Sequence, residues 1–87
     1  MKPIVYSTHA AERMRQRGAT ADEIETAIRN VGWQPAPRDR WTVKMQLVFD
    51  ALSPVNQQRY RYKKIEVLFA EDPNAIVVIT VKAFYHN

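Results

Sequence analysis

The order of hydrophobic and polar residues changes its period part-way along the chain. In the first third, apolar residues recur every three or four positions, as on one side of a helix. They are Ala10 and Met14 in one segment, and Ile24, Ala27, Ile28 and Val31 in the next. From position 41 onward they alternate with polar residues, as on a strand with one buried face. The pattern therefore predicts two helices followed by a β-sheet.

Short sequence signals mark where the two helices begin and end. The first helix is expected over about residues 7–17. Gly18 follows, and glycine is the usual residue at the left-handed position behind a helix. Thr20 and Glu23 match a capping box, in which each side chain accepts a hydrogen bond from the other residue's backbone amide. The second helix is therefore expected to begin there and to end near Gly32.

Three longer strands are predicted in the rest of the chain, and a short one at its start. The predicted strands are Pro3–Tyr6, Trp41–Phe49, Arg59–Ala70 and Ile76–Tyr85, with loops at 51–57 and 71–74. The connector over residues 33–40 holds two prolines, which exclude a regular helix and a central strand. A helix over residues 41–52 is the alternative for the first long strand, but the β-branched and aromatic content favours the strand.

The predicted fold is one α+β domain over residues 1–87. A short N-terminal strand comes first, then two helices, then a three-stranded antiparallel sheet. Helices followed by strands that are joined by short loops are typical of this class. Both helices have to bury an apolar stripe, so one sheet face is expected to be covered and the other to be open.

Composition excludes several classes of protein. The chain is 46% hydrophobic, which is enough for a folded core and argues against disorder. There is no cysteine, and the two histidines have no ligand-like spacing, so no disulfide, no metal and no cofactor are expected. The longest apolar run, residues 76–81, is too short to span a membrane, and the N-terminus lacks a signal-peptide pattern. A cytoplasmic location without membrane contact is expected.

The charge balance points to an anionic partner. Thirteen basic residues exceed nine acidic ones, which gives a net charge of +4. A basic surface favours nucleic acid or an acidic protein. Many small domains of similar charge bind no nucleic acid, so the placement of the charges decides more than their sum.

Strand parity separates the residues of the two sheet faces. The predicted core side holds Trp41, Val43, Met45, Leu47, Phe49, Ile65, Val67, Phe69, Val77, Ile79, Val81 and Ala83. The other face holds Lys44, Gln46, Tyr60, Tyr62, Lys64, Glu66, Thr80, Lys82, Phe84 and His86. Lysine neutralises phosphates, and aromatic rings stack on unpaired bases. We therefore predict a single-stranded RNA interface formed by Lys44, Tyr60, Arg61, Tyr62, Lys64, Lys82 and His86. Arg61 has the parity of the core side, but we include it because it belongs to the basic run 59–64.

The first helix carries a motif that resembles a known family. Residues 6–18 read Tyr-Ser-x-His-Ala-x-x-Arg-Met-x-x-Arg-Gly, and the Thr-x-x-Glu box follows. This opening is similar to that of a widespread bacterial family of small domains of unknown function, whose last strand resembles Val-Val-Ile-Thr-Val-Tyr. Here that strand is residues 77–81, with Lys82 in place of the Tyr, so a role of that Tyr does not carry over. The likeness covers nearly the whole chain and is weakest between residues 33 and 56.

The family is similar in layout to the RelE/ParE and BrnT toxins, a group of small ribonucleases and gyrase poisons. The resemblance implies a RelE/ParE toxin-like fold more firmly than an activity, because one fold supports many functions. It also implies the partners of such toxins, which are single-stranded RNA or the ribosome and an acidic antitoxin-like protein.

Candidate catalytic residues lie along one edge of the first helix. His9, Arg13 and Arg17 recur every four residues beside the apolar stripe. Histidine titrates near neutral pH, and arginine binds phosphate through two parallel hydrogen bonds. We therefore predict a metal-independent endoribonuclease, with His9 as general acid or base and the two arginines as phosphate ligands. The spacing does not show whether this edge meets the open sheet face.

Two other function classes remain open at this stage. The chain is a non-catalytic binding module if His9 only caps the helix. It is a protein-interaction module if its target resembles that of the gyrase-directed toxins. The loop over residues 50–58 is long enough to alter or cover the open face.

Overall fold

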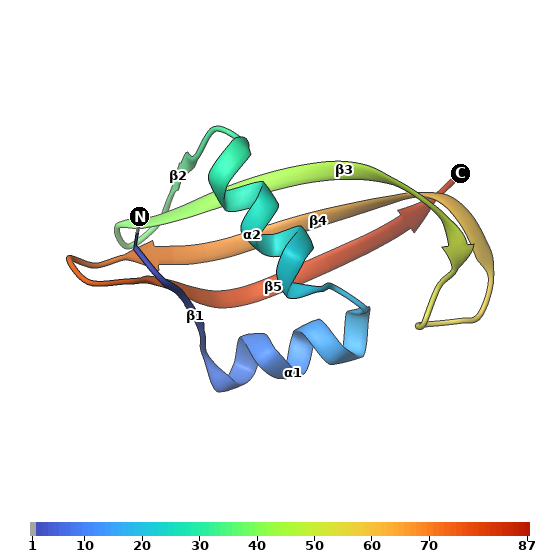
Figure 1. Cartoon of the computed structure of the whole chain (residues 1–87), viewed down its shortest axis with the longest axis horizontal. Coiled ribbons are helices and arrows are strands. Elements are labelled where there is room, and N and C mark those ends of the chain that lie inside the picture. The colour runs from blue at the N-terminus through green and yellow to red at the C-terminus, as the bar shows by residue number, and fades with distance from the viewer. Residues whose placement is uncertain (1) are drawn as a thin grey trace.

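The computed structural model describes residues 2–87, which form two helices and five strands (Figure 1). In chain order they are β1 (Ile4–Tyr6), α1 (Thr8–Arg17), α2 (Ala21–Asn30), β2 (Gln34–Ala36), β3 (Arg40–Leu52), β4 (Arg59–Glu71) and β5 (Ile76–His86). The predicted α+β class is confirmed, and so are both helices and the long strands. Residues 41–52 belong to a strand and not to a helix.

The sheet has five strands, where the sequence predicts three and a separate short one. Their order is β1-β5-β4-β3-β2 among the described residues. The three long strands are antiparallel as predicted, with Val43, Val67 and Val81 aligned across them. A short strand extends each edge. β1 pairs parallel with the start of β5, where Ile4 lies opposite Ile76, and β2 pairs antiparallel with the start of β3.

The irregular connector predicted for residues 33–40 contains the edge strand β2, which is a correction. Pro35 is tolerated because it lies at the outer edge of the sheet, where no neighbouring strand needs its amide. Arg38 and Asp39 then reverse the chain with φ angles of 66° and 58°. Ahead of β2, the ring of Trp33 packs edge-on against Phe69, with 4.8 Å between the centroids.

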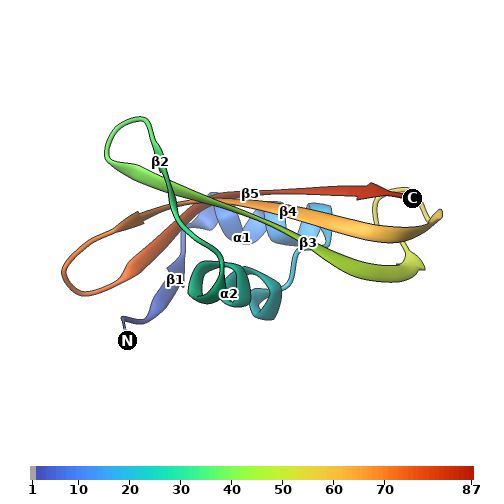
Figure 2. The same ribbon diagram turned by 90° about the horizontal axis from the view of Figure 1, so that it is seen from above.

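The hydrophobic core lies between the helices and one face of the sheet. In Figures 1 and 2, α2 crosses that face and α1 runs beside β5. Ala10 of α1 and Ile24, Ala27 and Ile28 of α2 are buried, so the predicted apolar stripes face the sheet. The buried apolar residues of the long strands are Val43, Ile65, Val67, Phe69, Ile76, Val78 and Val81.

A β-bulge changes the predicted parity at the start of β5. The register of β4 against β5 shifts next to Ile79. A bulge places two residues of one strand opposite one residue of the next, which moves the alternation by one position. Ile76 and Val78 are therefore buried in the core, where the sequence pattern predicts Val77 and Ile79.

Backbone carbonyls at this bulge hold the start of α1. Ser7 is the N-cap, and its hydroxyl oxygen accepts a hydrogen bond of 3.0 Å from the Ala10 amide. Ser7 also donates its amide to the Val78 carbonyl at 3.0 Å and its hydroxyl to the Ile79 carbonyl at 3.1 Å. Consequently α1 begins directly on β5 and continues along the stretch of its edge that β1 leaves unpaired.

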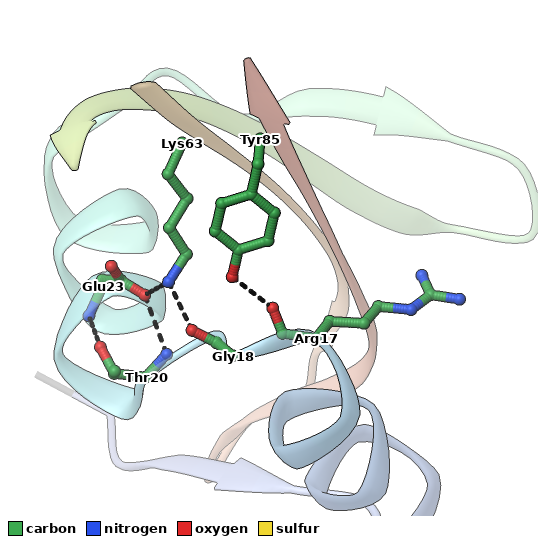
Figure 3. Close-up of polar contacts among 6 residues, drawn as sticks. All are labelled: Arg17, Gly18, Thr20, Glu23, Lys63 and Tyr85. Atoms are coloured by element: carbon green, nitrogen blue, oxygen red, sulfur yellow. Dashed lines mark hydrogen bonds and ion pairs between the residues drawn. The ribbon is translucent and has the colours of Figure 1, made fainter. Parts of the chain in front are cut away.

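Lys63 is a buried cation where the two helices meet the sheet (Figure 3). Its ammonium group donates to the Gly18 carbonyl and, at 2.7 Å, to the Glu23 carboxylate. The rings of Phe49 and Tyr85 lie beside it, with centroids 5.5 and 5.7 Å from Nζ. Because the same carboxylate completes the capping box of α2, Lys63 connects β4 to the end of α1 and to the start of α2.

The loop between β3 and β4 folds toward the helix side of the sheet. Ser53 is buried, and its amide donates to the Gln58 carbonyl at 2.8 Å, which closes the turn. Pro54 lies so near Gly18 that a methyl group on this glycine would collide with it. The loop thus contacts the connection between the helices through Pro54 and does not cover the open face, although Asp50 at its start lines a hollow with Val48 and Tyr62.

Candidate nucleic-acid interface

The sheet face opposite the helices presents side chains from β3, β4 and β5 in aligned rows. We call it the open face, and its residues are Thr42, Lys44, Gln46, Val48, Tyr62, Lys64, Glu66, Leu68, Thr80, Lys82, Phe84 and His86. Each row takes one residue from each strand, because the antiparallel register places them directly opposite one another. The rows change from charged to aromatic along the strands, so the open face has two chemically different ends.

The lysine end of the open face is formed by Lys44, Lys64, Glu66 and Lys82. Glu66 on β4 lies opposite Lys44 on one side and opposite Lys82 on the other. Lys64 Nζ lies 3.6 Å from Glu66 Oε2. Three lysines therefore neighbour one glutamate, and the excess positive charge suits a phosphate group.

A hollow of about 290 Å³ opens at the lysine end. Its lining residues are Ala36, Thr42, Glu66, Val67, Leu68, Thr80 and Lys82. The volume is close to the lower limit of small-ligand pockets, about 300 Å³. The hollow brings together a carboxylate, an ammonium group and two threonine hydroxyls, which is a suitable set for a sugar–phosphate unit.

The aromatic end of the open face is formed by Val48, Tyr62, Phe84 and His86. The rings of Tyr62 and His86 stack on each other, with centroids 5.5 Å apart and an angle of 29° between their planes. Phe84 is 46% exposed and Val48 is 77% exposed. Large apolar groups at the surface together with a stacked pair of rings make a platform on which a nucleobase can lie.

Tyr60 and Arg61 do not lie where parity predicts them. The Tyr60 ring is 5.9 Å from the ring of Tyr85, so it joins the aromatic side chains near Lys63 on the helix side. The register of β3 against β4 shifts after Val48, and a bulge of this kind increases the local twist. Arg61 is exposed at the strand end and lines a shallow hollow with Val48, beside the aromatic end.

The row predicted along α1 meets the sheet at two of its three residues. His9 Nε2 lies 3.1 Å from Thr80 Oγ1, and Arg17 donates to the Val81 carbonyl at 3.4 Å. Arg13 instead donates to a glutamine of its own helix. Because Thr80 lines the hollow at the lysine end, His9 lies at the border of the open face. The sequence alone did not establish this contact.

Within residues 2–87, no three histidine, aspartate or glutamate side chains are grouped so that they could hold a metal ion. In the same range, no helix is long and apolar enough to cross a membrane. The groups that the open face and its border offer to a ligand are ammonium, carboxylate, hydroxyl and imidazole groups and aromatic rings.

One protein family matches most of the chain. It is described as Domain of unknown function (DUF4258), and the match covers residues 6–82. The chain belongs to this family. No curated protein matches the chain, and no solved structure matches it. The predicted membership of a family of unknown function is thus confirmed, whereas the likeness to the RelE/ParE and BrnT toxins stays a prediction.

The DUF4258 match includes one end of the open face more fully than the other. His9, Glu66 and Thr80 lie within residues 6–82, as does the rest of the lysine end. Phe84 and His86 lie beyond the match. The lysine end and its border with α1 therefore belong to the matched domain, and part of the aromatic end does not.

Proposed function

We propose that this DUF4258 domain binds single-stranded RNA on the open face and cleaves it there without a metal ion, as a toxin-type endoribonuclease. The hydrogen-bond contact between His9 and Thr80 carries this proposal, because it brings an imidazole ring to the border of the hollow at the lysine end. Messenger RNA, free or on the ribosome, is the substrate that fits the proposal, and an acidic antitoxin-like protein is the partner that would cover the same charges.

The lysine end supports binding of the RNA backbone. Lys44 and Lys82 are exposed, and Lys64 is half-buried beside them. Each lysine that neutralises a phosphate releases a condensed counterion, so affinity falls as salt concentration rises. Arg61, exposed near the aromatic end, can contact the next phosphate along the strand.

The aromatic end supports binding of unpaired bases. A duplex hides its base faces inside the stack, whereas a single strand can place them on protein rings. Tyr62 and His86 already stack on each other, and Phe84 is partly exposed next to them. Base stacking on a protein ring contributes about 1–3 kcal/mol per base, so this end favours a single strand over a duplex.

His9 supports cleavage. A metal-independent ribonuclease needs one group that takes a proton from the ribose 2′-hydroxyl and one that gives a proton to the leaving oxygen. Each such group typically raises the rate by about 10²–10⁴-fold. His9 is exposed at the border of the hollow, so it can reach a phosphate bound there. Arg13 and Arg17 on the same helix edge are the proposed phosphate ligands, and Arg17 lies nearer the sheet through its bond to Val81.

Binding can be tested with a labelled single-stranded RNA oligonucleotide over a range of salt concentrations. We expect K44A, K64A, K82A and R61A each to weaken binding and to lower the slope of log affinity against log salt by about one. A second hollow lies between α1 and the start of α2, away from the open face, and Arg15 and Glu12 line it. The matched control is R15A, which removes an exposed positive charge next to this hollow between the helices. Unchanged salt slopes in all four open-face variants, or no binding at low salt, would contradict the proposal.

Cleavage can be tested on the same RNA with a chelator present, with and without ribosomes. We expect the wild type to cleave in at least one format and a folded His9→Ala variant to be slower by about 10²-fold or more. Equal rates would remove His9 from the mechanism. Binding without cleavage in either format would leave a binding module, and capture of an acidic protein without any RNA binding would point to a protein-interaction module.

A further inference from the structure

We infer that Glu66 is the general base of this cleavage and that His9 is its general acid. The inference rests on the proposed function, and it assigns a role to a carboxylate that the binding surface alone does not need. Glu66 is the one acidic residue among the twelve of the open face. It lies in the middle strand at the lysine end and is one of the residues that line the hollow.

Glu66 works against RNA binding and contributes only modestly to stability, through its cross-strand positions opposite Lys44 and Lys82. A carboxylate among three lysines repels the phosphate that the lysines attract, so it weakens a surface that only has to bind RNA. Its pair with Lys64 is 3.6 Å long, and both side chains are partly exposed, at 24% and 39%. Partly exposed pairs of this kind contribute little to folding. A chemical role accounts for a carboxylate at this position.

Glu66 lines the hollow, and His9 contacts Thr80, which is another residue of its lining. Thr80 is opposite Leu68, two positions along β4 from Glu66, so Glu66 and Thr80 are diagonal neighbours about 7–8 Å apart. His9 Nε2 lies 3.1 Å from Thr80 Oγ1. In the proposed complex, a phosphate in the hollow lies between the Glu66 carboxylate and the His9 imidazole. In-line displacement at phosphorus requires this separation of base and acid, because the entering and leaving oxygens are on opposite sides.

The reaction can be written with these two groups alone. The Glu66 carboxylate removes the proton from a ribose 2′-hydroxyl, and the 2′-oxygen forms a bond to the adjacent phosphorus. The bond from phosphorus to the 5′-oxygen breaks, and that oxygen takes a proton from the His9 imidazolium. The products are a 2′,3′-cyclic phosphate and a 5′-hydroxyl. Lys44 and Lys82, on the two sides of Glu66, are placed to stabilise the negative charge that builds up on the phosphate oxygens.

The test uses full-length protein and an oligonucleotide with one ribonucleotide in an otherwise deoxyribonucleotide strand, so that a single linkage can be cut. A second substrate has sulfur in place of the 5′-bridging oxygen of that linkage. A thiolate leaves without being protonated, so this substrate needs a base but no acid. The variants are E66Q and H9A, and the control is E12Q, which removes an exposed carboxylate on α1 next to the hollow between the helices. Circular dichroism and thermal unfolding verify that each variant is folded.

We expect E66Q to cleave both substrates about 10²–10⁴-fold more slowly than the wild type, which is the usual range for loss of a general base. E66Q should bind RNA as tightly as the wild type or more tightly, because a negative charge has been removed from among the lysines. H9A should be slow on the normal linkage and should regain most of its rate on the sulfur linkage. E12Q should cleave like the wild type.

Several results would overturn the inference. Normal cleavage by E66Q removes Glu66 from the chemistry, and rescue of E66Q by the sulfur linkage makes it the acid. A wild type that binds RNA and cleaves neither substrate rejects both catalytic assignments while RNA binding stands. Loss of RNA binding in E66Q shows that the carboxylate organises the surface and does not act on the substrate. Absence of RNA binding in the wild type rejects the proposed function itself, and the two failures are thereby distinguished.

Discussion

The two faces of the sheet use the same three strands for different purposes. On the helix side, β3, β4 and β5 contribute buried apolar residues, and the ammonium group of Lys63 donates to two acceptors. One position along each strand, the open face presents lysines, threonines and aromatic rings that touch few neighbours. The difference shows that strand alternation alone can separate the residues that stabilise the domain from those that are free to meet a ligand. Substitutions at adjacent positions should therefore have very different consequences.

The sharpest test of the comparison is the adjacent pair Phe69 and Leu68 on β4. Phe69 is 0% exposed and packs against Trp33, so Phe69→Ala should lower the free energy of unfolding by about 4 kcal/mol. Leu68 is half-buried on the open face, so Leu68→Ala should cost less than half as much. Urea unfolding followed by tryptophan fluorescence measures both. Equal losses would mean that the open face also belongs to a packed interior.

Lys63 is expected to give the next largest effect. Lys63→Ala removes the donor of the Gly18 carbonyl and leaves the Glu23 carboxylate with the Thr20 amide as its donor but without its cation, which should cost about 2–3 kcal/mol. This loss is near the lower end of the values for removing one partner of a buried ion pair, because the Glu23 side chain is 18% exposed. The double variant K63M/E23Q removes both charges and keeps the volume and the capping residue, so it should recover part of the loss. A double variant less stable than K63A would show that the ion pair itself stabilises the fold.

The helix side should also respond to alkaline pH. The Tyr6 hydroxyl donates to the Glu25 carboxylate at 3.0 Å, and burial together with this bond raises the pKa of Tyr6 to about 12. The folded state therefore keeps its proton where the unfolded state loses it. The contribution of Tyr6 to the free energy of unfolding is complete below about pH 10 and is lost as pH rises from about 10 to about 12. Unfolding midpoints in urea should fall across this window, and Tyr6→Phe should make the fall smaller. Part of the fall in the unfolding midpoint should persist in Y6F, because burial also raises the pKa of Tyr85.

The smallest effect on stability is expected at the lysine end. K44A and K82A remove exposed side chains for which no hydrogen bond or ion pair is seen within residues 2–87, so each should change the free energy of unfolding by less than about 0.5 kcal/mol. K64A loses the pair with Glu66 and should stay within about 1 kcal/mol. Thermal unfolding of the three variants measures this. A large loss in any of them would mean that this end of the open face is part of the structural framework.

Much of the fold follows from local sequence signals, and the exceptions involve distant partners. Thr20 and Glu23 specify the start of α2 within four residues, and the alternation in β3 and β4 specifies their buried faces. The pairing of β1 with β5 joins residues far apart in sequence, and no local signal reports it. The bulge next to Ile79 depends on how β4 and β5 match, so a strict alternation misplaces Ile76 and Val78.

The candidate site was predictable to a similar extent. Parity places Lys44, Tyr62, Lys64, Lys82 and His86 on the open face, and the structure agrees. Tyr60 lies elsewhere because a bulge in the neighbouring strand alters the twist at the strand end. The contact of His9 with Thr80 depends on how α1 docks, which residue spacing cannot show.

Lys63 is a residue whose burial is not apparent from the charge pattern of the sequence. In the sequence it is one of the basic residues in the run 59–64, and such runs are usually solvated. Its parity with Ile65, Val67 and Phe69 is the signal of burial, and this signal conflicts with its charge. The conflict is resolved in the structure by a carboxylate from α2 and a carbonyl from the end of α1.

The position of β5 between β1 and β4 has a consequence for the order of assembly. During synthesis, β1 and α1 are made well before the strand on which they pack, because Ile4 of β1 pairs with Ile76 of β5, 72 residues later in the sequence. Pairing between such distant segments is slow, and incomplete chains expose unpaired strands and apolar surface. His9 and Thr80 consequently come together in the same late step that completes the sheet. A growing chain that has not yet reached β5 lacks Thr80 and Lys82, and nothing holds His9 beside Glu66.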